Sequence, residues 1–265
     1  FKAETITKEK DDFLETPRLL AIDIETYTDK NRQIDMQKNP ILMVALHGDN
    51  FERVICWKKT KTSVKDAVFV KDEAELLREI KKSIEEYKPD VICGYFSDGF
   101  DLPYIKARAD LRKVKLDLGL DNSEIKVDSR RQSTVDIRGI NHLDVFKFVK
   151  KTVAATLDRF ELGLGKVAKD LLGETKNEVD LDELGPIWDK KPEKLGKFME
   201  YNLHDAYLTY KLAQKLMPNM IEFNKIVGLP IPDIARVGFS QLVETYILRQ
   251  AKEQNQLAPP PPKDA

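Results

Sequence analysis

The sequence predicts an α/β fold in which a mixed sheet is flanked by helices. Three observations support this fold class. Short apolar runs typical of strands recur within residues 18–57. A helical pattern at residues 72–88 leads directly into a further apolar run at 91–95, and a long helical pattern spans 192–216. With 265 residues and 42% hydrophobic content, the chain can build a sizeable core from these elements.

The composition excludes several classes of protein. Lys+Arg 44 against Asp+Glu 45 gives a net charge of -1, so any nucleic-acid binding must be local. Cys56 and Cys93 lie far apart in apolar runs, which argues against a zinc site or a disulfide framework and predicts buried free thiols. No apolar run approaches the ~20 residues of a membrane span. We therefore expect a protein that does not bind membranes, located in the cytoplasm, or in the nucleus if the source is eukaryotic. In isolation the chain is expected to be a monomer.

The first three predicted strands should be antiparallel neighbours. In the first strand, Asp23 and Glu25 are two residues apart and therefore lie on one face of the sheet. The next two runs, at residues 41–46 and 53–57, are joined around residues 48–50, which is typical of a hairpin.

A helix, a strand and a loop follow. Asp72 can cap the helix, and Pro89 ends it just before the buried strand. The loop at residues 97–99 then breaks the chain before Phe100-Asp101, where a second helix is expected to start. Loops at strand ends are where α/β proteins usually build their functional sites.

The remaining elements are a hairpin and three helices. Short runs either side of Arg130 and Arg131 predict a polar hairpin that projects from the body of the domain. Residues 156–172 and 239–254 are expected to be mostly helical. In the long helix at 192–216, Tyr201 and Asp205 are four residues apart and therefore share a face.

Three acidic motifs recur in order along the chain and supply four carboxylates and one phenol. These residues are Asp23, Glu25, Asp101, Tyr201 and Asp205. Such a set can hold two divalent cations over a phosphodiester, with a hydroxyl left to orient the attacking water. The sequence therefore predicts a metal-dependent phosphodiesterase site.

Each motif alone has an ordinary structural explanation. Paired carboxylates on a strand more often belong to a face exposed to solvent. In isolation, Asp101 would be explained as a carboxylate that stabilises a helix N-terminus, and Tyr201 as a tyrosine of the core. Asp205 alone is a surface charge. The apolar neighbours Leu20 and Ile22 indicate that the first strand lies in the core. Carboxylates on a core strand are costly to bury unless a partner or a cation compensates their charge. Only the ordered set of motifs favours the functional interpretation.

Other polar residues are more simply explained by structure. His204 adjoins Asp205 but projects roughly 100° away on a helix. We therefore expect it to lie on the surface or to pack against other side chains, and not to be a metal ligand. His47 and His142 lie in or near strands and are expected to be structural. Residues 163–166 lack the spacing of a phosphate loop and indicate a helix irregularity. The lysine pairs at 58–59, 150–151 and 190–191 are expected to be solvated, although one of them could contact phosphates.

The three motifs resemble those of a known family. Residues 23–26, 95–101 and 201–205 are similar to the first, second and third exonuclease motifs of family B DNA polymerases of the archaeal type. The resemblance covers about residues 19–218. Beyond it, residues 238–244 and 255–259 are similar to the segment that leads into the polymerase palm.

The resemblance implies a domain layout. Residues 1–17 would be a tail or linker, residues 18–218 the 3′→5′ exonuclease domain, and residues 219–265 a helical segment with a Pro-rich tail. The palm and the large amino-terminal domain of the family are absent, and both ends look cut from a longer polypeptide. The missing polymerase portion is therefore an expected partner.

The resemblance also implies a fold and a reaction. The fold would be ribonuclease-H-like, the DnaQ-like exonuclease fold, with a mixed sheet of five strands flanked by helices. The reaction would be proofreading, in which nucleoside 5′-monophosphates are removed stepwise from single-stranded or mismatched DNA 3′ ends. Two Mg²⁺ or Mn²⁺ ions would serve as cofactors.

Roles for the site residues follow from the same resemblance. Asp23 would bridge both metals, while Glu25 and Asp205 would complete the site of the metal that carries the attacking water. Asp101 would hold the second metal directly or through water. Tyr201 would orient the nucleophilic water by a hydrogen bond.

The second motif departs from the family pattern. The family usually has Asn where this chain has Phe96 and a second Asn where it has Gly99. Phe96 and Phe100 could instead stack on a base of the DNA, which contributes roughly 1–3 kcal/mol. Arg130 and Arg131 at the hairpin tip would contact phosphates.

Two alternatives stay open on the sequence alone. One is a module that holds nucleic acid without turnover because its second motif has decayed, although the intact carboxylates argue against it. The other is a stand-alone nuclease that acts on RNA, which only a comparison of substrates separates from the DNA nuclease.

Overall fold

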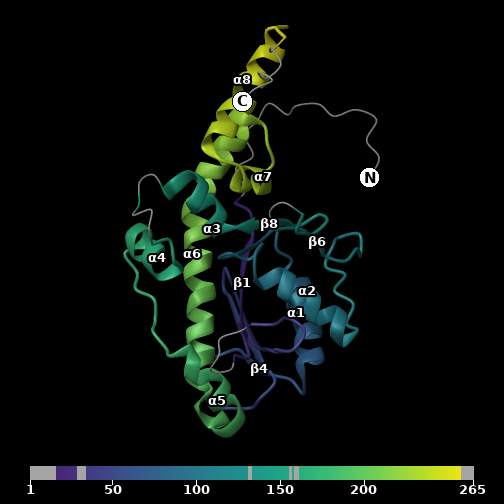
Figure 1. The fold of residues 1–265 in the computed structure, drawn as a ribbon, viewed down its shortest axis with the longest axis vertical. Helices are drawn as coiled ribbons and strands as arrows, with labels where there is room; N and C mark the ends of the chain where they lie inside the picture. Colours follow the sequence, from purple (N-terminus) through teal and green to yellow (C-terminus); the bar gives the residue numbers. More distant parts are fainter. Residues whose placement is uncertain (1–15, 29–33, 131–132, 155–156, 158–160, 258–265) are drawn as a thin grey trace.

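The computed structural model describes residues 16–28, 34–130, 133–154, 157 and 161–257. Its centre is a six-stranded sheet in the order β4-β3-β2-β1-β5-β8 (Figure 1). The strands are β1 (Leu19–Thr26), β2 (Ile41–Gly48), β3 (Phe51–Cys56), β4 (Ala67–Phe69), β5 (Val91–Gly94) and β8 (Asn141–Asp144). A separate two-stranded sheet is formed by β6 (Lys126–Asp128) and β7 (Thr134–Asp136).

The sheet is mixed, as predicted. β1 pairs antiparallel with β2, and β2 with β3, so the prediction of three antiparallel neighbours is confirmed. β5 pairs parallel with β1 and with β8, and β4 pairs parallel with β3. The expected number of five strands is wrong because β4 adds a sixth at the edge. β4 has only three residues, too few to show a strand pattern in the sequence.

Helices cover both faces of the sheet (Figure 1). They are α1 (Glu73–Tyr87), α2 (Asp101–Arg112), α3 (Val145–Phe148), α4 (Leu164–Leu172), α5 (Leu184–Lys190), α6 (Gly196–Val227), α7 (Ile231–Arg236) and α8 (Phe239–Glu253). Figure 1 shows α1 and α2 on one side of β1 and the long helix α6 on the other. α6 runs past β1 and β2 and makes the main helix contact with the sheet.

The period of two along β1 decides which side chains face which helices. Leu20, Ile22 and Ile24 belong to the buried cluster that includes α1 and α2. Leu19 and Ala21 point the other way, into the cluster that includes α6 and α4. The odd-numbered positions further along the strand therefore face α6.

Helix boundaries agree with the sequence where capping residues are present. Asp72 caps α1, and its side chain accepts a hydrogen bond from the backbone N–H of Glu75. The expected helix at 156–172 is too long, because the described residues 161–163 are not helical and Gly163 is the N-cap of α4. α6 begins at Gly196 and passes through Pro218 to Val227. This one helix crosses the expected end of the exonuclease domain at 218, and the domain boundaries stay a prediction.

Both cysteines are buried free thiols, as predicted. Burial raises the pKa of the Cys56 thiol to about 11 and that of Cys93 to about 12, so both stay protonated at neutral pH. Within the described ranges, no helix has both the length and the apolar character that crossing a bilayer requires.

Candidate active site

Asp23 and Glu25 lie on the face of β1 that α6 covers. They continue the alternation of Leu19 and Ala21 and are half-buried. On α6, Asp205 is one turn beyond Tyr201, and both side chains are buried. The first and third motifs therefore meet between β1 and α6.

Three of the four predicted carboxylates meet in one close group, and the fourth, Asp101, lies beside that group. Carboxylate oxygens of Asp23, Glu25 and Asp205 all lie within 4.8 Å of one another. Asp101 is the first residue of α2, and its Oδ1 accepts a hydrogen bond of 3.2 Å from the backbone N–H of Ile24. This contact is available because β1 pairs with β5 only from Leu19 to Ala21, which leaves the strand edge beyond free.

Crowding of like charges disfavours ionisation of the cluster. Burial, followed by the charges of Asp101, Asp205 and Glu25, raises the pKa of Asp23 well above its ordinary value. Burial also raises the pKa of Glu25 to about 8 and that of Asp101 to about 7, and it raises the pKa of Asp205. The site at neutral pH therefore favours binding of protons or cations.

The donor set fits magnesium or manganese. All donors are carboxylate oxygens, which these hard cations prefer. Oδ1 of Asp205 is buried and has no hydrogen-bond partner in the described structure. A bound cation would satisfy this atom and offset the repulsion within the cluster.

Lys176 enters the site from the segment between α4 and α5 and was not predicted. Its Nζ lies 2.6 Å from Oδ2 of Asp205 and 4.8 Å from the centroid of the Tyr201 ring, and it is hydrogen-bonded to the Tyr201 side chain. Burial alone would lower the pKa of Lys176, but Asp205 outweighs burial and the pKa is raised. Lys176 therefore stays charged and links the side chains of Tyr201 and Asp205 on α6.

Asn202 is a second residue that the sequence did not indicate. Its Nδ2 donates a hydrogen bond of 2.6 Å to Oδ2 of Asp23, and its side chain is fully buried. Asn202 follows Tyr201 on α6, so it reaches a different part of the cluster. The amide fixes the orientation of one oxygen of Asp23 and links β1 to α6.

A hollow of about 550 Å³ opens next to these residues. Its walls come from α4, from the segment that carries Lys176, and from Tyr201 of α6. Its size is within the range of sites that hold small molecules. The hollow provides room for a ligand beside the phenol and the ammonium group.

A buried ion network anchors the loop of the second motif. Asp98 accepts a hydrogen bond of 2.6 Å from the backbone N–H of Val135 and lies 2.7 Å from Nζ of Lys147 and 3.1 Å from Arg236. Burial alone would raise the pKa of Asp98, but the nearby side chain of His142 and the hydrogen bonds from Arg236 and Lys147 hold this pKa well below its ordinary range. The loop that leads to Asp101 is thereby fixed to β7, α3 and α7.

Phe96 and Gly99, the two departures from the family pattern, fit each other. Phe96 has φ of 68°, a left-handed conformation that is uncommon for aromatic residues. Its side chain is 48% exposed, and its ring lies edge-on to Phe146 at 5.5 Å. A Cβ atom added to Gly99 would lie 2.4 Å from Cζ of Phe96. The glycine therefore leaves the space that the phenyl ring occupies.

The other predicted DNA contacts have different surroundings. Phe100 is half-buried, packs against the core, and has its ring 5.3 Å from that of Tyr104. Arg130 is 89% exposed and pairs with Asp128 at 2.7 Å on its own hairpin. Arg131 lies outside the described residues. The roles of these residues in binding nucleic acid stay predictions.

The three histidines make structural contacts. His142 is buried, with Nε2 2.9 Å from Oγ of Ser97. His47 packs against the rings of Tyr207 and Tyr210. Nδ1 of His204 accepts a hydrogen bond of 3.2 Å from the backbone N–H of residue 177. None of them belongs to the carboxylate cluster among the described residues.

Comparison with known proteins identifies relatives of this chain. Residues 2–163 match the model of the family described as DNA polymerase family B, exonuclease domain. A DNA polymerase of Pyrococcus horikoshii is 33% identical over 92% of this chain and 19% of its own length. A DNA polymerase of Pyrococcus glycovorans is 34% identical over 93% of this chain and 31% of its own length. The chain thus spans about a third or less of the length of these relatives.

A solved structure shows the same fold. The family B DNA polymerase of the hyperthermophilic archaeon Pyrobaculum calidifontis superimposes with a TM-score of 0.75 and 24% sequence identity. The match covers 97% of this chain and 32% of that one. The mixed sheet with helices on both faces is accordingly the ribonuclease-H-like exonuclease fold that the sequence predicted. The family-model match and the fold together lead to one conclusion: this chain belongs to the exonuclease-domain family of the family B DNA polymerases.

Proposed function

We propose that this chain is a 3′→5′ exonuclease that uses two divalent cations, Mg²⁺ or Mn²⁺, to remove nucleoside 5′-monophosphates from single-stranded or mismatched DNA 3′ ends. The observation that carries this proposal is the meeting of four carboxylates from three separate motifs in one half-buried cluster. Such a cluster is costly to fold unless cations bind to it.

Asp23, Glu25 and Asp205 would hold one cation, because their oxygens lie within 4.8 Å of one another. Asp101 lies beside them on α2 and would hold the second cation together with Asp23. When bound, the cations would stabilise the charge that develops on the attacking and leaving oxygens. Asn202 would keep Asp23 in the orientation that serves both positions.

Tyr201 would orient the attacking water. Burial, followed by the charge of Asp205, raises the pKa of the Tyr201 phenol, so the hydroxyl keeps its proton at neutral pH. A protonated phenol can donate one hydrogen bond and accept another. Lys176 would hold both the hydroxyl and Asp205 in place from the side of the hollow.

The substrate would be a flexible strand end. A paired 3′ end must first unpair before it enters the cleft, and unpairing costs a few kcal/mol. The exposed ring of Phe96 would stack on a base near the terminus, with Phe100 behind it. Arg130 and Arg131 would contact phosphates from the β6–β7 hairpin.

We further propose that the chain is the proofreading part of a longer family B DNA polymerase. Its relatives are DNA polymerases at least three times its length. The remaining polymerase portion would deliver mismatched ends to this site.

A single assay tests the proposed function. A single-stranded DNA oligonucleotide labelled at its 5′ end is incubated with the protein in Mg²⁺ or in EDTA. We expect a ladder that shortens from the 3′ end in Mg²⁺ and no change in EDTA. Binding without cleavage in Mg²⁺ and in Mn²⁺ would instead favour the non-catalytic module. An RNA oligonucleotide of the same sequence separates the DNA nuclease from the RNA nuclease.

A further inference from the structure

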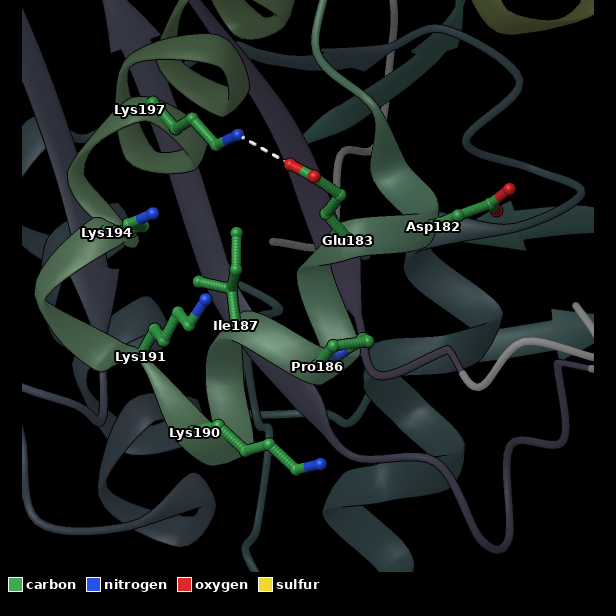
Figure 2. Close-up of a pocket in the computed structure, with 8 residues that line it drawn as sticks. All are labelled: Asp182, Glu183, Pro186, Ile187, Lys190, Lys191, Lys194 and Lys197. Carbon is green, nitrogen blue, oxygen red and sulfur yellow. Dashed lines mark hydrogen bonds and ion pairs between the residues drawn. The ribbon is translucent and has the colours of Figure 1, made fainter.

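A basic hollow lies where α5 meets the start of α6, outside the carboxylate cluster (Figure 2). Its volume is about 570 Å³. It is lined by Lys190, Lys191, Lys194, Lys197, Asp182, Glu183, Pro186 and Ile187. We call it the lysine pocket. Four lysines against two acids concentrate positive charge here, although the chain as a whole has a net charge of -1.

Acidic side chains offset part of the positive charge of the lysine pocket, and Lys197, Lys194 and Lys191 all lower the pKa of Glu183. Lys197 forms an ion pair with Glu183, with Nζ 2.9 Å from Oε2. Both side chains are about half exposed, so water and salt weaken the pair. Among the described residues, Lys190, Lys191 and Lys194 have no carboxylate within ion-pair distance. Figure 2 shows Lys191 beside Ile187, which lines the hollow, and Lys197 opposite, directed at Glu183.

The lysine pocket shares a face of α6 with the candidate active site. Lys197, Tyr201 and Asp205 follow one another at intervals of four residues. At about 1.5 Å per residue, Lys197 precedes Tyr201 by about 6 Å and Asp205 by about 12 Å along the helix axis. A strand of a few nucleotides can therefore reach from one site to the other.

β1 also connects the two sites. The hydroxyl of Tyr27, two residues beyond Glu25, donates a hydrogen bond of 2.8 Å to Asp189 of α5. A Cβ atom on Gly185 would lie 2.2 Å from the carbonyl oxygen of Thr28, so α5 packs tightly on the chain that leaves β1. The lysine pocket is thus fixed to the strand that carries the first motif.

We propose that the lysine pocket binds phosphate groups of the DNA strand whose 3′ end lies in the carboxylate cluster. The inference rests on the proposed function for the identity of that strand. Lysine ammonium groups are compact charges that bind phosphate without regard to sequence. Pro186 and Ile187 add an apolar surface against which a sugar can pack. Two sites on one helix face would hold the strand at two points and set its path.

The test measures binding apart from hydrolysis. The ligand is a labelled phosphorothioate dodecathymidylate, which keeps the backbone charge and resists cleavage, and binding is followed by fluorescence anisotropy in Mg²⁺ between about 50 and about 200 mM salt. The pocket variant carries Lys190→Ala, Lys191→Ala and Lys194→Ala. The control variant carries Lys88→Ala, Lys215→Ala and Lys252→Ala, which removes the same charge from exposed lysines elsewhere. Thermal midpoints equal to that of the wild-type protein establish that both variants are folded.

We expect the pocket variant to bind the dodecamer at least tenfold more weakly at the lowest salt. The slope of log affinity against log salt should fall in magnitude by about 0.7 for each phosphate that the variant no longer neutralises, or about 2 for three phosphates. The control variant should keep the wild-type slope. Equal slopes and affinities in the two variants would overturn the proposal.

Two further ligands distinguish phosphates of a DNA strand from the phosphate of a free nucleotide. A thymidine dinucleotide carries a single phosphodiester, which the cluster would hold, so no phosphate is left for the pocket and we expect wild-type affinity for it in the pocket variant. If the variant instead loses affinity for thymidine monophosphate but not for the dodecamer, the pocket serves a free nucleotide and the proposal is overturned. Because no cleavage is measured, this result and the nuclease assay can fail independently.

Discussion

The carboxylate cluster and the lysine pocket are linked by α6, which carries Asp205 in the first and Lys197 in the second, yet the two sites differ in sign and in burial. The cluster gathers four acidic groups in a half-buried cleft between β1 and α6. The lysine pocket gathers four basic groups on the exposed surface where α5 meets the start of α6. Like charges are crowded in both places, but only in the cluster are they withdrawn from water.

The two sites are stabilised in different ways. In the cluster, burial raises the pKa values of all four carboxyl groups, so protons or cations are needed to offset the repulsion. In the lysine pocket, water and salt screen the ammonium groups from one another, which weakens their mutual repulsion. The first arrangement suits chemistry on bound cations, and the second suits reversible contact with phosphates.

Asp23→Ala should have the largest effect on cleavage, and it should show most clearly that the cluster and the lysine pocket have different roles. Asp23 is central to the cluster, and loss of cation binding removes several kcal/mol of transition-state stabilisation. We expect cleavage of single-stranded DNA to fall by at least about 10³-fold. Binding of the phosphorothioate dodecamer should keep its salt slope, since the lysines are unchanged. Cleavage at the wild-type rate would show that the site has been assigned wrongly.

Tyr201→Phe should have an intermediate effect on the cluster. The change removes one hydroxyl and leaves all four carboxylates in place, so we expect turnover to fall by about 10- to 100-fold. Calorimetric titration with Mn²⁺ should give nearly the wild-type affinity. A collapse of metal affinity would mean that Tyr201 supports the structure of the site instead of orienting water.

Phe96→Asn should weaken DNA binding because it removes the aromatic ring that would stack on a base. Loss of stacking should cost roughly 1–3 kcal/mol in affinity for single-stranded DNA, while the salt slope stays unchanged because no charge is removed. Stability should not fall, since Asn adopts positive φ more readily than Phe does. Ile226→Asn, which replaces another half-exposed apolar side chain, is the matched control. Equal affinity in the two variants would exclude Phe96 from the DNA path.

The metal-free protein should lose stability as pH rises, because the crowded carboxyl groups of the cluster ionise. Glu25 and Asp101 have folded-state pKa values of about 8 and about 7, above those of the unfolded chain. Their stabilising effect is complete below the unfolded-state pKa and is lost as pH rises through the folded-state pKa.

In EDTA we expect the thermal midpoint to fall by several degrees between about pH 5 and about pH 8. Glu25→Gln and added Mg²⁺ should each reduce this fall, whereas the pocket variant should retain it. A midpoint that is independent of pH in EDTA would argue against repulsion in the cluster.

The sequence predicted the parts of the site that lie within regular elements. The spacing of Asp23 and Glu25 on a strand and of Tyr201 and Asp205 on a helix sets their faces, and the apolar neighbours of β1 indicate burial. The hairpin of β2 and β3 follows from two apolar runs and a short turn. Local periodicity is sufficient for these features.

The residues that were missed depend on tertiary structure. Lys176 lies in an irregular polar segment, and only the packing of that segment on α6 brings its ammonium group to Asp205. The direction of Asn202 towards Asp23 depends on how α6 crosses β1. In the sequence, the lysine pair at 190–191 is typical of a solvated face. Only the folded structure shows that this pair lines a hollow together with Lys194 and Lys197, where α5 meets the start of α6. Pairs of charges distant in sequence leave no local pattern.

The number of bound cations is the most direct evidence for or against a two-metal site at the carboxylate cluster. In a calorimetric titration with Mn²⁺, the wild-type chain should bind two ions, and the pocket variant should bind two with unchanged affinity. Asp23→Ala should bind fewer ions or bind them at least tenfold more weakly, because this change removes the ligand that both cations share. Absence of Mn²⁺ binding by the wild-type chain, or equal stoichiometry and affinity in Asp23→Ala, would contradict the account of the carboxylate cluster as a two-metal nuclease site.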